Sequence, residues 1–205
     1  MNRPEHAGLA VGNPFSTRHT RPGAVPYLFS PGQTLEGLLS KLALSDWWGE
    51  IVGPHGSGKS TLLARLIEVA PQHRRWPLLI ALHDRQRSLP IDLTKRTDLD
   101  GSTLIVVDGY EQLGRWQRMR LKQLCRRQGW GLLVTSHASV GLPRLYETAV
   151  TLDLARRVVQ QLLSGSPSGT WTNGVVDRCY QQCDGNLREM LFLLYDQYER
   201  GEFRL

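Results

Sequence analysis

Apolar and polar residues follow two different spacings along the middle of the chain. Short, almost wholly apolar runs predict buried strands, which we place at 48–52, 77–82, 103–108, 131–136 and 149–154. Apolar residues at helical spacing between these runs predict helices from Thr34 and over 61–69, 111–127 and 142–146. Because strands and helices alternate, we expect a mostly parallel sheet with helices on both faces, which is an α/β fold.

The last quarter of the chain carries helical spacing alone. It predicts helices over 155–163 and 175–183, with a flexible joint at 164–170 between them. A third helix follows Asn186, which is placed to cap it, and Glu189 stands three residues on as the capping-box partner. We therefore expect an irregular N-terminal arm at 1–33, an α/β core at 34–154 and a small helical lid at 155–205.

Composition and charge narrow the class of protein only a little. The 205 residues include three cysteines, which lack the spacing of a disulfide framework or a zinc site. No leader opens the sequence, and its apolar runs fall far short of the roughly 20 residues of a membrane helix, so we expect a soluble cytoplasmic protein without membrane contact. The net charge of +6 favours polyanionic partners but is also common for solubility, so charge alone decides nothing.

The stretch "GPHGSGKS" fits the spacing of a phosphate-binding loop, with Gly53, Gly58, Lys59 and Ser60 at the required positions. Glycines let successive backbone N–H groups point at a phosphate at the positive end of the following helix. A chance glycine turn is the alternative, but the apolar strand before the loop and the helix after it favour phosphate binding. The predicted binding residues are Gly53, Pro54, His55, Gly56, Ser57, Gly58, Lys59, Ser60 and Thr61. We expect His55 to be an exposed loop residue rather than a catalytic one.

Asp108 ends the apolar run "TLIVVD", where a carboxylate at the carboxyl end of a strand faces the loop. With the Ser60 hydroxyl it predicts a magnesium site, although an aspartate here can also simply cap a helix. The loop and this aspartate together resemble the P-loop NTPases. Since the strand at 77–82 lies between the two motifs, the chain is most similar to the branch with the AAA+ and signal-transduction (STAND) ATPases.

The chain departs from that pattern directly after the aspartate. Where many of these ATPases carry a glutamate that polarises the attacking water, this chain has Gly109, and the nearest carboxylate is Glu111. Glu111 reaches the water if Gly109 turns the backbone sharply, or else it caps the next helix. Slow hydrolysis, or nucleotide binding used as a switch, follows from this departure.

The resemblance implies further roles. Thr135 or Ser136, at the end of "GLLVTS", would be the family's first sensor of the γ-phosphate, and Arg188 in "GNLRE" would be the second. Arg144 would be an arginine finger for a neighbouring subunit, which would make the protein a homo-oligomer. Each also has a plainer interpretation, as a strand end or a solvated charge. Pro26 and Tyr27 either shape an adenine pocket or anchor the N-terminal arm.

A basic stripe follows the strand aspartate. Its members, which share one face of the helix at 111–127, are Arg115, Arg118, Lys122 and Arg126. It is a track for nucleic-acid phosphates, a surface for an acidic partner, or simply a solvated face.

The leading hypothesis is an ATPase or nucleotide-dependent switch of AAA+ or STAND type, with ATP and Mg²⁺ as cofactors and a protein or nucleic-acid partner. The alternative is a small-molecule or nucleotide kinase, whose lid arginines would be Arg156 and Arg157. A third hypothesis is a nucleic-acid adaptor that does not hydrolyse ATP. GTP is disfavoured only by the lack of an Asn-Lys-x-Asp motif.

Overall fold

The computed structural model describes residues 13–20, 24, 26–83, 85–164 and 173–201, and it divides the chain into two compact units. One unit is Pro26–Val150, and the other joins Met1–Val25 to Thr151–Leu205. About half of the predicted N-terminal arm and all but one residue of the predicted joint at 164–170 lie outside the described residues.

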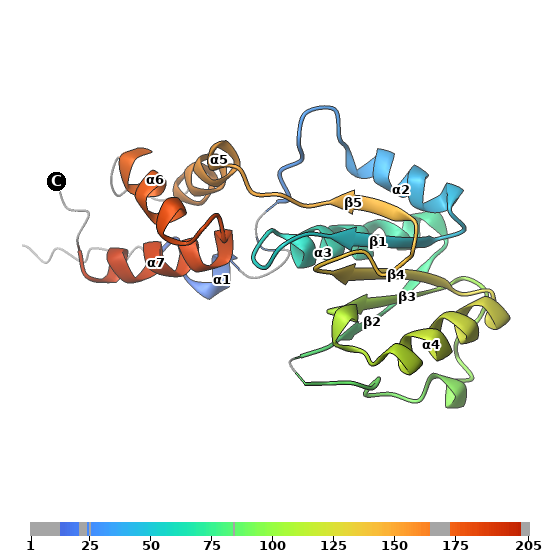
Figure 1. Cartoon of the computed structure of the whole chain (residues 1–205). Coiled ribbons are helices and arrows are strands. Elements are labelled where there is room, and N and C mark those ends of the chain that lie inside the picture. Colours follow the sequence, from blue (N-terminus) through green and yellow to red (C-terminus); the bar gives the residue numbers. More distant parts are fainter. Residues whose placement is uncertain (1–12, 21–23, 25, 84, 165–172, 202–205) are drawn as a thin grey trace, which may run out of the picture. The chain divides into compact units, whose positions relative to one another are not determined.

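The unit Pro26–Val150 is built on a five-stranded parallel sheet with the order β2-β3-β4-β1-β5 (Figure 1). Its strands are β1 (Trp48–Val52), β2 (Trp76–Ala81), β3 (Thr103–Asp108), β4 (Gly131–Ser136) and β5 (Arg144–Glu147). The register pairs Val52 with Ser136 and Ala81 with Asp108. The parallel direction therefore brings the carboxyl ends of β1, β3 and β4, with the residues that follow them, to one edge of the sheet.

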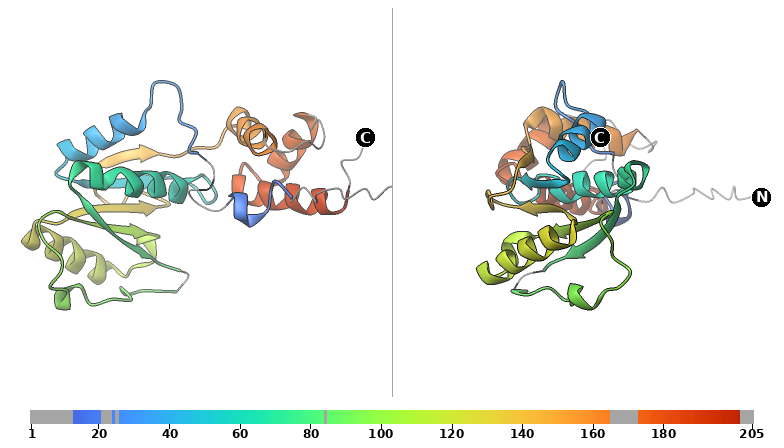
Figure 2. Two further views of the ribbon diagram at one scale, coloured as in Figure 1. Left: turned by 180° about the vertical axis from the view of Figure 1, so that it is seen from behind. Right: turned by 90° about the vertical axis from the view of Figure 1, so that its right-hand side faces the viewer.

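Helices cover both faces of this sheet (Figure 2). Side chains of β3 alternate between the faces, so that Leu104 and Val106 pack with α2 (Leu35–Leu44) and α3 (Lys59–Val69). Ile105 and Val107 pack instead with Leu121 and Cys125 of α4 (Arg115–Gln128). The predicted α/β fold with a mostly parallel sheet and helices on both faces is confirmed.

Two predicted elements after β4 are wrong. The segment predicted as a helix at 142–146 contains β5, because Arg144, Tyr146 and Glu147 pair with β1 at the edge of the sheet. The strand predicted at 149–154 does not form, because α5 (Leu152–Leu163) begins there, with the Thr151 side chain accepting a hydrogen bond from the Leu154 N–H. The helix predicted at 111–127 starts later, at Arg115, after a short 3₁₀ turn (η3, Tyr110–Gln112).

The other unit is helical, as predicted for the end of the chain. It contains α1 (Thr17–Thr20), α5, α6 (Asn173–Gln182) and α7 (Leu187–Glu199). Asn186 caps α7 as predicted, because its side chain accepts from the Glu189 N–H at 3.3 Å. The Glu189 carboxylate accepts from the Asn186 side-chain amide at 2.9 Å rather than from its backbone N–H, which donates to the carbonyl of Cys183, so the capping box itself is not complete. From the N-terminal segment, Asn13 donates to Glu199 at 2.8 Å and to the carbonyl of Tyr195 at 3.1 Å. The two ends of the described chain thus share one helical unit.

No helix in the described parts of the chain has the length and apolar character needed to cross a bilayer.

Candidate functional site

Glycines shape the loop between β1 and α3 in two ways. Gly56 and Gly58 have positive φ angles of 68° and 87°, in the left-handed region that glycine tolerates best, and Gly58 forms the N-cap of α3. Gly53 is required for close packing, since a Cβ atom there would lie 2.1 Å from Thr148 Oγ1 and 2.5 Å from its carbonyl oxygen. The loop is thereby wrapped at the N-terminus of a helix of 11 residues, where unpaired N–H groups favour anions.

Thr148, just after β5, ties the loop to the sheet. Its hydroxyl lies 2.6 Å from that of Ser57, and its backbone N–H donates to Val52 at 2.7 Å. Ser57 also donates to the carbonyl of Pro54 at 2.8 Å. Both hydroxyls are buried, so these bonds fix the loop from the side of the sheet.

Lys59 is the cation of the loop. Its ammonium donates to the carbonyls of Gly53 and Pro54, each at 2.7 Å, and the residue is only 9% exposed. Burial lowers the pKa of Lys59, while the negative charges of Glu111 and Asp108 act in the opposite direction. An anion bound in the loop would favour the charged ammonium further.

Asp108 and Thr135 meet at the carboxyl edge of the sheet. The Thr135 hydroxyl donates to Asp108 Oδ1 at 2.5 Å and accepts from the N–H of Gly109 at 2.9 Å. Thr135 is 1% exposed, so its rotamer is fixed by packing as well as by these bonds. Of the two residues considered for the first sensor position, Thr135 is the one beside the aspartate, because Ser136 donates to Ala138 instead.

Gly109 turns the backbone sharply, with a φ of 82°. A Cβ atom there would lie 2.9 Å from the carbonyl oxygen of Leu82, so both the φ angle and the space favour glycine. The turn carries Glu111 in η3 rather than on α4, whose N-cap is Gly114. Of the two roles considered for Glu111, capping the following helix does not occur.

The Glu111 carboxylate is bound on one side only. Its Oε1 lies 2.8 Å from Nε2 of His137, while its Oε2 is buried and finds no hydrogen-bond partner among the described residues. A buried carboxylate oxygen without a partner is costly, and it marks a place where a donor such as water fits.

His137 is the site residue that the sequence reasoning missed. It follows β4 directly, and its Nδ1 lies 3.3 Å from the carbonyl oxygen of Gly53 and 3.4 Å from Nζ of Lys59. Its ring faces that of His55, with 3.7 Å between the centroids. Burial and the charge of Lys59 lower the pKa of His137, against the opposite effect of Glu111. The one feature of the sequence that could have identified His137 is its position directly after a predicted strand.

The side chains at this edge fit a magnesium nucleotide. The Ser60 hydroxyl in the first turn of α3 and the Asp108 carboxylate are oxygen ligands of the kind that Mg²⁺ prefers. Among the described residues, no group of three or more His, Cys, Asp or Glu side chains could hold a metal ion by itself. This donor set suits an ion that keeps waters and substrate phosphates as its other ligands.

Two further predicted residues have nucleotide roles that the structure does not test. Arg144 donates to Glu147 at 2.8 Å and lies 3.8 Å from Glu50, within its own chain. Arg188 is exposed in the first turn of α7, in the other unit. Their roles at a nucleotide remain predictions.

Tyr27 packs beside the loop. Its ring would lie 3.4 Å from a Cβ atom at Gly58, and its centroid is 4.9 Å from Phe29 and 6.2 Å from Tyr146, both edge-on. Burial raises the pKa of the Tyr27 phenol. These contacts anchor the start of this unit to its core, whereas Pro26 is exposed.

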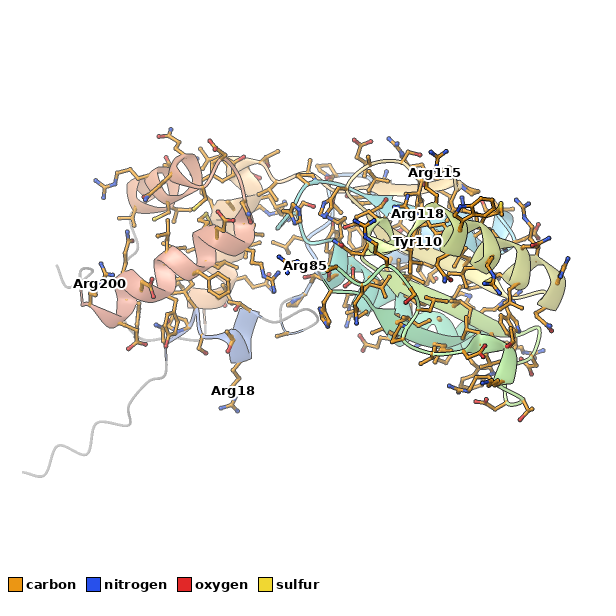
Figure 3. All side chains as sticks on the ribbon, turned by 60° about the horizontal axis from the view of Figure 1, so that its bottom comes forward. Arg18, Arg85, Tyr110, Arg115, Arg118 and Arg200 are labelled. Carbon is orange, nitrogen blue, oxygen red and sulfur yellow. The ribbon has the colours of Figure 1, made fainter. Side chains whose placement is uncertain are left out.

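The basic stripe on α4 is largely occupied by contacts within the protein. Arg118 donates to the carbonyls of Leu113 and Glu111 and lies over the ring of Tyr110 (Figure 3). Lys122 donates to the carbonyl of Val140 at 2.8 Å, and Arg126 lies over the ring of Trp48. Arg115 and Arg126 are both exposed, but only Arg126 has such a contact. Three of the four cations therefore hold neighbouring segments in place.

Comparisons with known proteins identify the fold. No protein-family model matches the sequence, and neither does any curated protein. RuvB of Thermotoga maritima, a Holliday junction branch migration motor, superposes with a TM-score of 0.53 and 16% identity, over 78% of this chain and 60% of RuvB. NtrX of Brucella abortus, solved in complex with ADP, gives a TM-score of 0.55 and 11% identity, over 82% of this chain and 50% of NtrX.

The chain thus spans between half and two thirds of the length of these neighbours. At such low identity the likeness establishes the architecture alone. The predicted resemblance is confirmed at the level of the fold, which this chain shares with RuvB and NtrX.

Proposed function

We propose that the chain binds Mg-ATP at the carboxyl edge of its sheet and hydrolyses it slowly to ADP and phosphate. The observation that carries the proposal is the meeting of Lys59, Asp108 and the half-bound Glu111 carboxylate beside the glycine loop. The ADP in the complex of the structural neighbour NtrX supports an adenine nucleotide.

Each residue has a role in this proposal. The N–H groups of the segment 53–61 and the Lys59 ammonium bind the phosphates, and Lys59 exchanges its bonds to loop carbonyls for bonds to phosphate oxygens. Ser60 and Asp108 hold Mg²⁺, which would neutralise charge on the phosphates. Thr135 orients Asp108 through their short hydrogen bond.

Glu111 acts on the attacking water. A water bound to its free Oε2 is oriented toward the γ-phosphorus, gives its proton to that carboxylate, and forms the new P–O bond as the bond to the β-phosphate oxygen breaks. Because Gly109 takes the usual position of the glutamate, the geometry depends on the turn at η3, and we expect slow turnover.

The helical unit would be the moving part. We propose that Arg188 contacts the γ-phosphate and that the helices of 155–205 respond to nucleotide as a lid on the core at 34–154. We also propose that Arg144 serves a neighbouring copy. It would first have to leave Glu147, to which it donates at 2.8 Å.

A cytoplasmic protein or nucleic-acid partner would receive the resulting movement. RuvB acts on a Holliday junction, which supports nucleic acid. In the basic stripe, however, only Arg115 lacks the contacts that occupy Arg118, Lys122 and Arg126. We therefore place any phosphate contact of α4 at Arg115.

The kinase alternative is not favoured. Arg156, which it would place in a mobile lid around the transferred phosphate, donates through two nitrogens to the carboxylate of Asp177, at 2.8 and 2.6 Å. This forked ion pair joins α5 to α6 within the helical unit.

Phosphate release from Mg-ATP without any added acceptor tests the proposal. The wild-type protein should release phosphate, and Asp108→Ala should reduce the rate at least about 100-fold, as expected when a charge-stabilising group is lost. Asp98→Ala is the matched control, because Asp98 is an exposed aspartate that pairs with Arg96. Release that occurs only with an added hydroxyl acceptor would point to the kinase, and no release under any condition would contradict the proposal.

A further inference from the structure

His137 lies between the two chemical parts of the site. Its Nε2 faces Glu111 Oε1 at 2.8 Å, and its Nδ1 faces Lys59 Nζ at 3.4 Å and the Gly53 carbonyl oxygen at 3.3 Å. His137 therefore contacts both the loop cation and the carboxylate.

These neighbours select one form of the ring. The Glu111 carboxylate accepts, so the Nε2 that faces it carries a proton. The Lys59 ammonium only donates, so the Nδ1 that faces it presents a lone pair. The neutral imidazole with its proton on Nε2 satisfies Glu111 and Lys59, while the Gly53 carbonyl, the third neighbour, already accepts from the Lys59 ammonium at 2.7 Å. The lowered pKa of His137 agrees with a neutral ring.

The same contacts decide where the Glu111 carboxylate points. The charge of Glu111 acts on Lys59, so the carboxylate and the ammonium are close enough to attract each other. The bond from His137 holds Oε1 and leaves Oε2 without a partner. Without that bond, the carboxylate would be free to turn toward Lys59 and lose its orientation toward water.

We propose that His137 is a positioning residue that holds Glu111 ready for the attacking water, and that its contact with Lys59 links this orientation to phosphate capture. When Lys59 leaves the carbonyls of Gly53 and Pro54 for a phosphate, its contact with His137 Nδ1 changes in the same movement. The inference rests on the proposed ATP hydrolysis, which it deepens by naming how the carboxylate is set.

Two substitutions separate positioning from a merely structural role. His137→Leu removes both hydrogen-bonding atoms, whereas His137→Gln offers an amide N–H to Glu111 and a carbonyl oxygen to Lys59. We expect single-turnover phosphate release to fall about 10- to 100-fold in His137→Leu and to recover to within about fivefold of wild type in His137→Gln. Mg-ADP affinity by calorimetry should change less than about threefold in both, because the phosphate ligands stay in place.

A double-mutant cycle gives the sharpest reading. If His137 acts through Glu111, then His137→Leu should cost little more than about twofold when Glu111→Gln is already present. His73→Leu is the matched control, since His73 lies in the 3₁₀ segment Ala70–His73 after α3, beside the exposed Glu36. It should leave the rate unchanged.

The outcomes distinguish a failure of the proposed hydrolysis from a failure of the positioning role of His137. If wild type releases no phosphate, the proposed hydrolysis fails. If wild type releases phosphate and His137→Leu does so equally well, or if the losses from His137→Leu and Glu111→Gln multiply in the double variant, the positioning role is overturned. Thermal unfolding of each variant identifies a fold defect. If His137→Leu is defective, His137→Gln decides. A His137→Gln variant that melts like wild type but releases phosphate as slowly as His137→Leu overturns the positioning role.

Discussion

Glu50 and Glu111 hold the two ends of the loop that joins β4 to β5, and they do so in opposite ways. Glu50, on β1, is 1% exposed and accepts hydrogen bonds from the Ser139 hydroxyl at 2.6 Å and from the N–H groups of Val140 and Leu142 at 2.9 and 3.2 Å. Glu111 contacts His137 through one oxygen, and its other oxygen is buried without a partner.

The difference distinguishes a carboxylate that stabilises the fold from one that is placed for a reaction. Both carboxylate oxygens of Glu50 accept hydrogen bonds from the protein. These bonds offset the cost of burying the charge and fix the loop. Glu111 keeps one acceptor unused at the edge where the glycine loop and Asp108 meet, which is costly unless a ligand or water supplies the donor. A stability measurement and a rate measurement should therefore rank the two residues in opposite orders.

The largest change in stability is expected for Glu50→Leu. Leucine is of similar size but leaves the N–H groups of Val140 and Leu142 unpaired, so we expect a loss of about 3 kcal/mol in the free energy of unfolding. For a chain of this size that lowers the melting temperature by about 6–12 °C. Calorimetric or spectroscopic thermal unfolding measures it.

Glu147→Leu is the control for this change. Glu147 also pairs with Arg144, but its side chain is 63% exposed, so we expect less than about 0.5 kcal/mol. Equal losses in Glu50→Leu and Glu147→Leu would show that the loop is not held by Glu50.

Glu111→Gln should show the reverse pattern. The substitution removes a charge whose buried Oε2 has no partner among the described residues, so the melting temperature should stay within about 2 °C of wild type or rise. The rate of phosphate release should fall about 100-fold, which corresponds to about 2.7 kcal/mol. Parallel unfolding and rate measurements test this contrast, and a large loss of stability with a normal rate would reverse the assignment of the two glutamates.

The smallest effect is expected in the pH dependence of stability. Burial and the charges of Lys59 and His55 lower the folded-state pKa of His137, whereas the charge of Glu111 raises it. His137 therefore binds a proton more readily in the unfolded chain than in the folded protein. The stability that the neutral His137 ring contributes is present above about pH 6.5 and is lost as the pH falls through the folded-state pKa.

When the pH is lowered from 7.5 to 5.5, we expect the free energy of unfolding to fall more in the wild type than in His137→Gln. The expected difference is less than about 1 kcal/mol. Chemical denaturation at the two pH values measures this difference. A wild type that gains stability relative to the variant on acidification would show that the sign is wrong.

The sequence predicted the parts of the site that local chemistry specifies. Gly58 needs a left-handed backbone, Lys59 opens a helix, and Asp108 ends a buried strand, so each carries its signal within a few residues. Thr135 was predicted together with Ser136 as a polar residue at the end of an apolar strand, and its role at a nucleotide stays a prediction.

Contacts between distant segments could not be predicted in this way. Thr148 and Ser57 are 91 positions apart, and His137 and Lys59 are 78 apart, so no local pattern joins them. The edge strand β5 was mistaken for a helix because its pairing with β1 decides its structure. The stripe on α4 looked like a free basic face because the carbonyl of Val140, which receives the Lys122 ammonium, lies outside that helix.

Calorimetric titration with Mg-ADP tests the central claim most directly, which is that the loop at 53–61 captures the phosphates of a nucleotide. We predict that the wild-type protein binds with one site and that Lys59→Ala weakens binding at least about tenfold, or about 1.4 kcal/mol. Lys41→Ala should bind like wild type, because the Lys41 ammonium donates to the carbonyl of Leu145 on β5. Equal affinity of Lys59→Ala and wild type, or no heat of binding in either, would contradict the account.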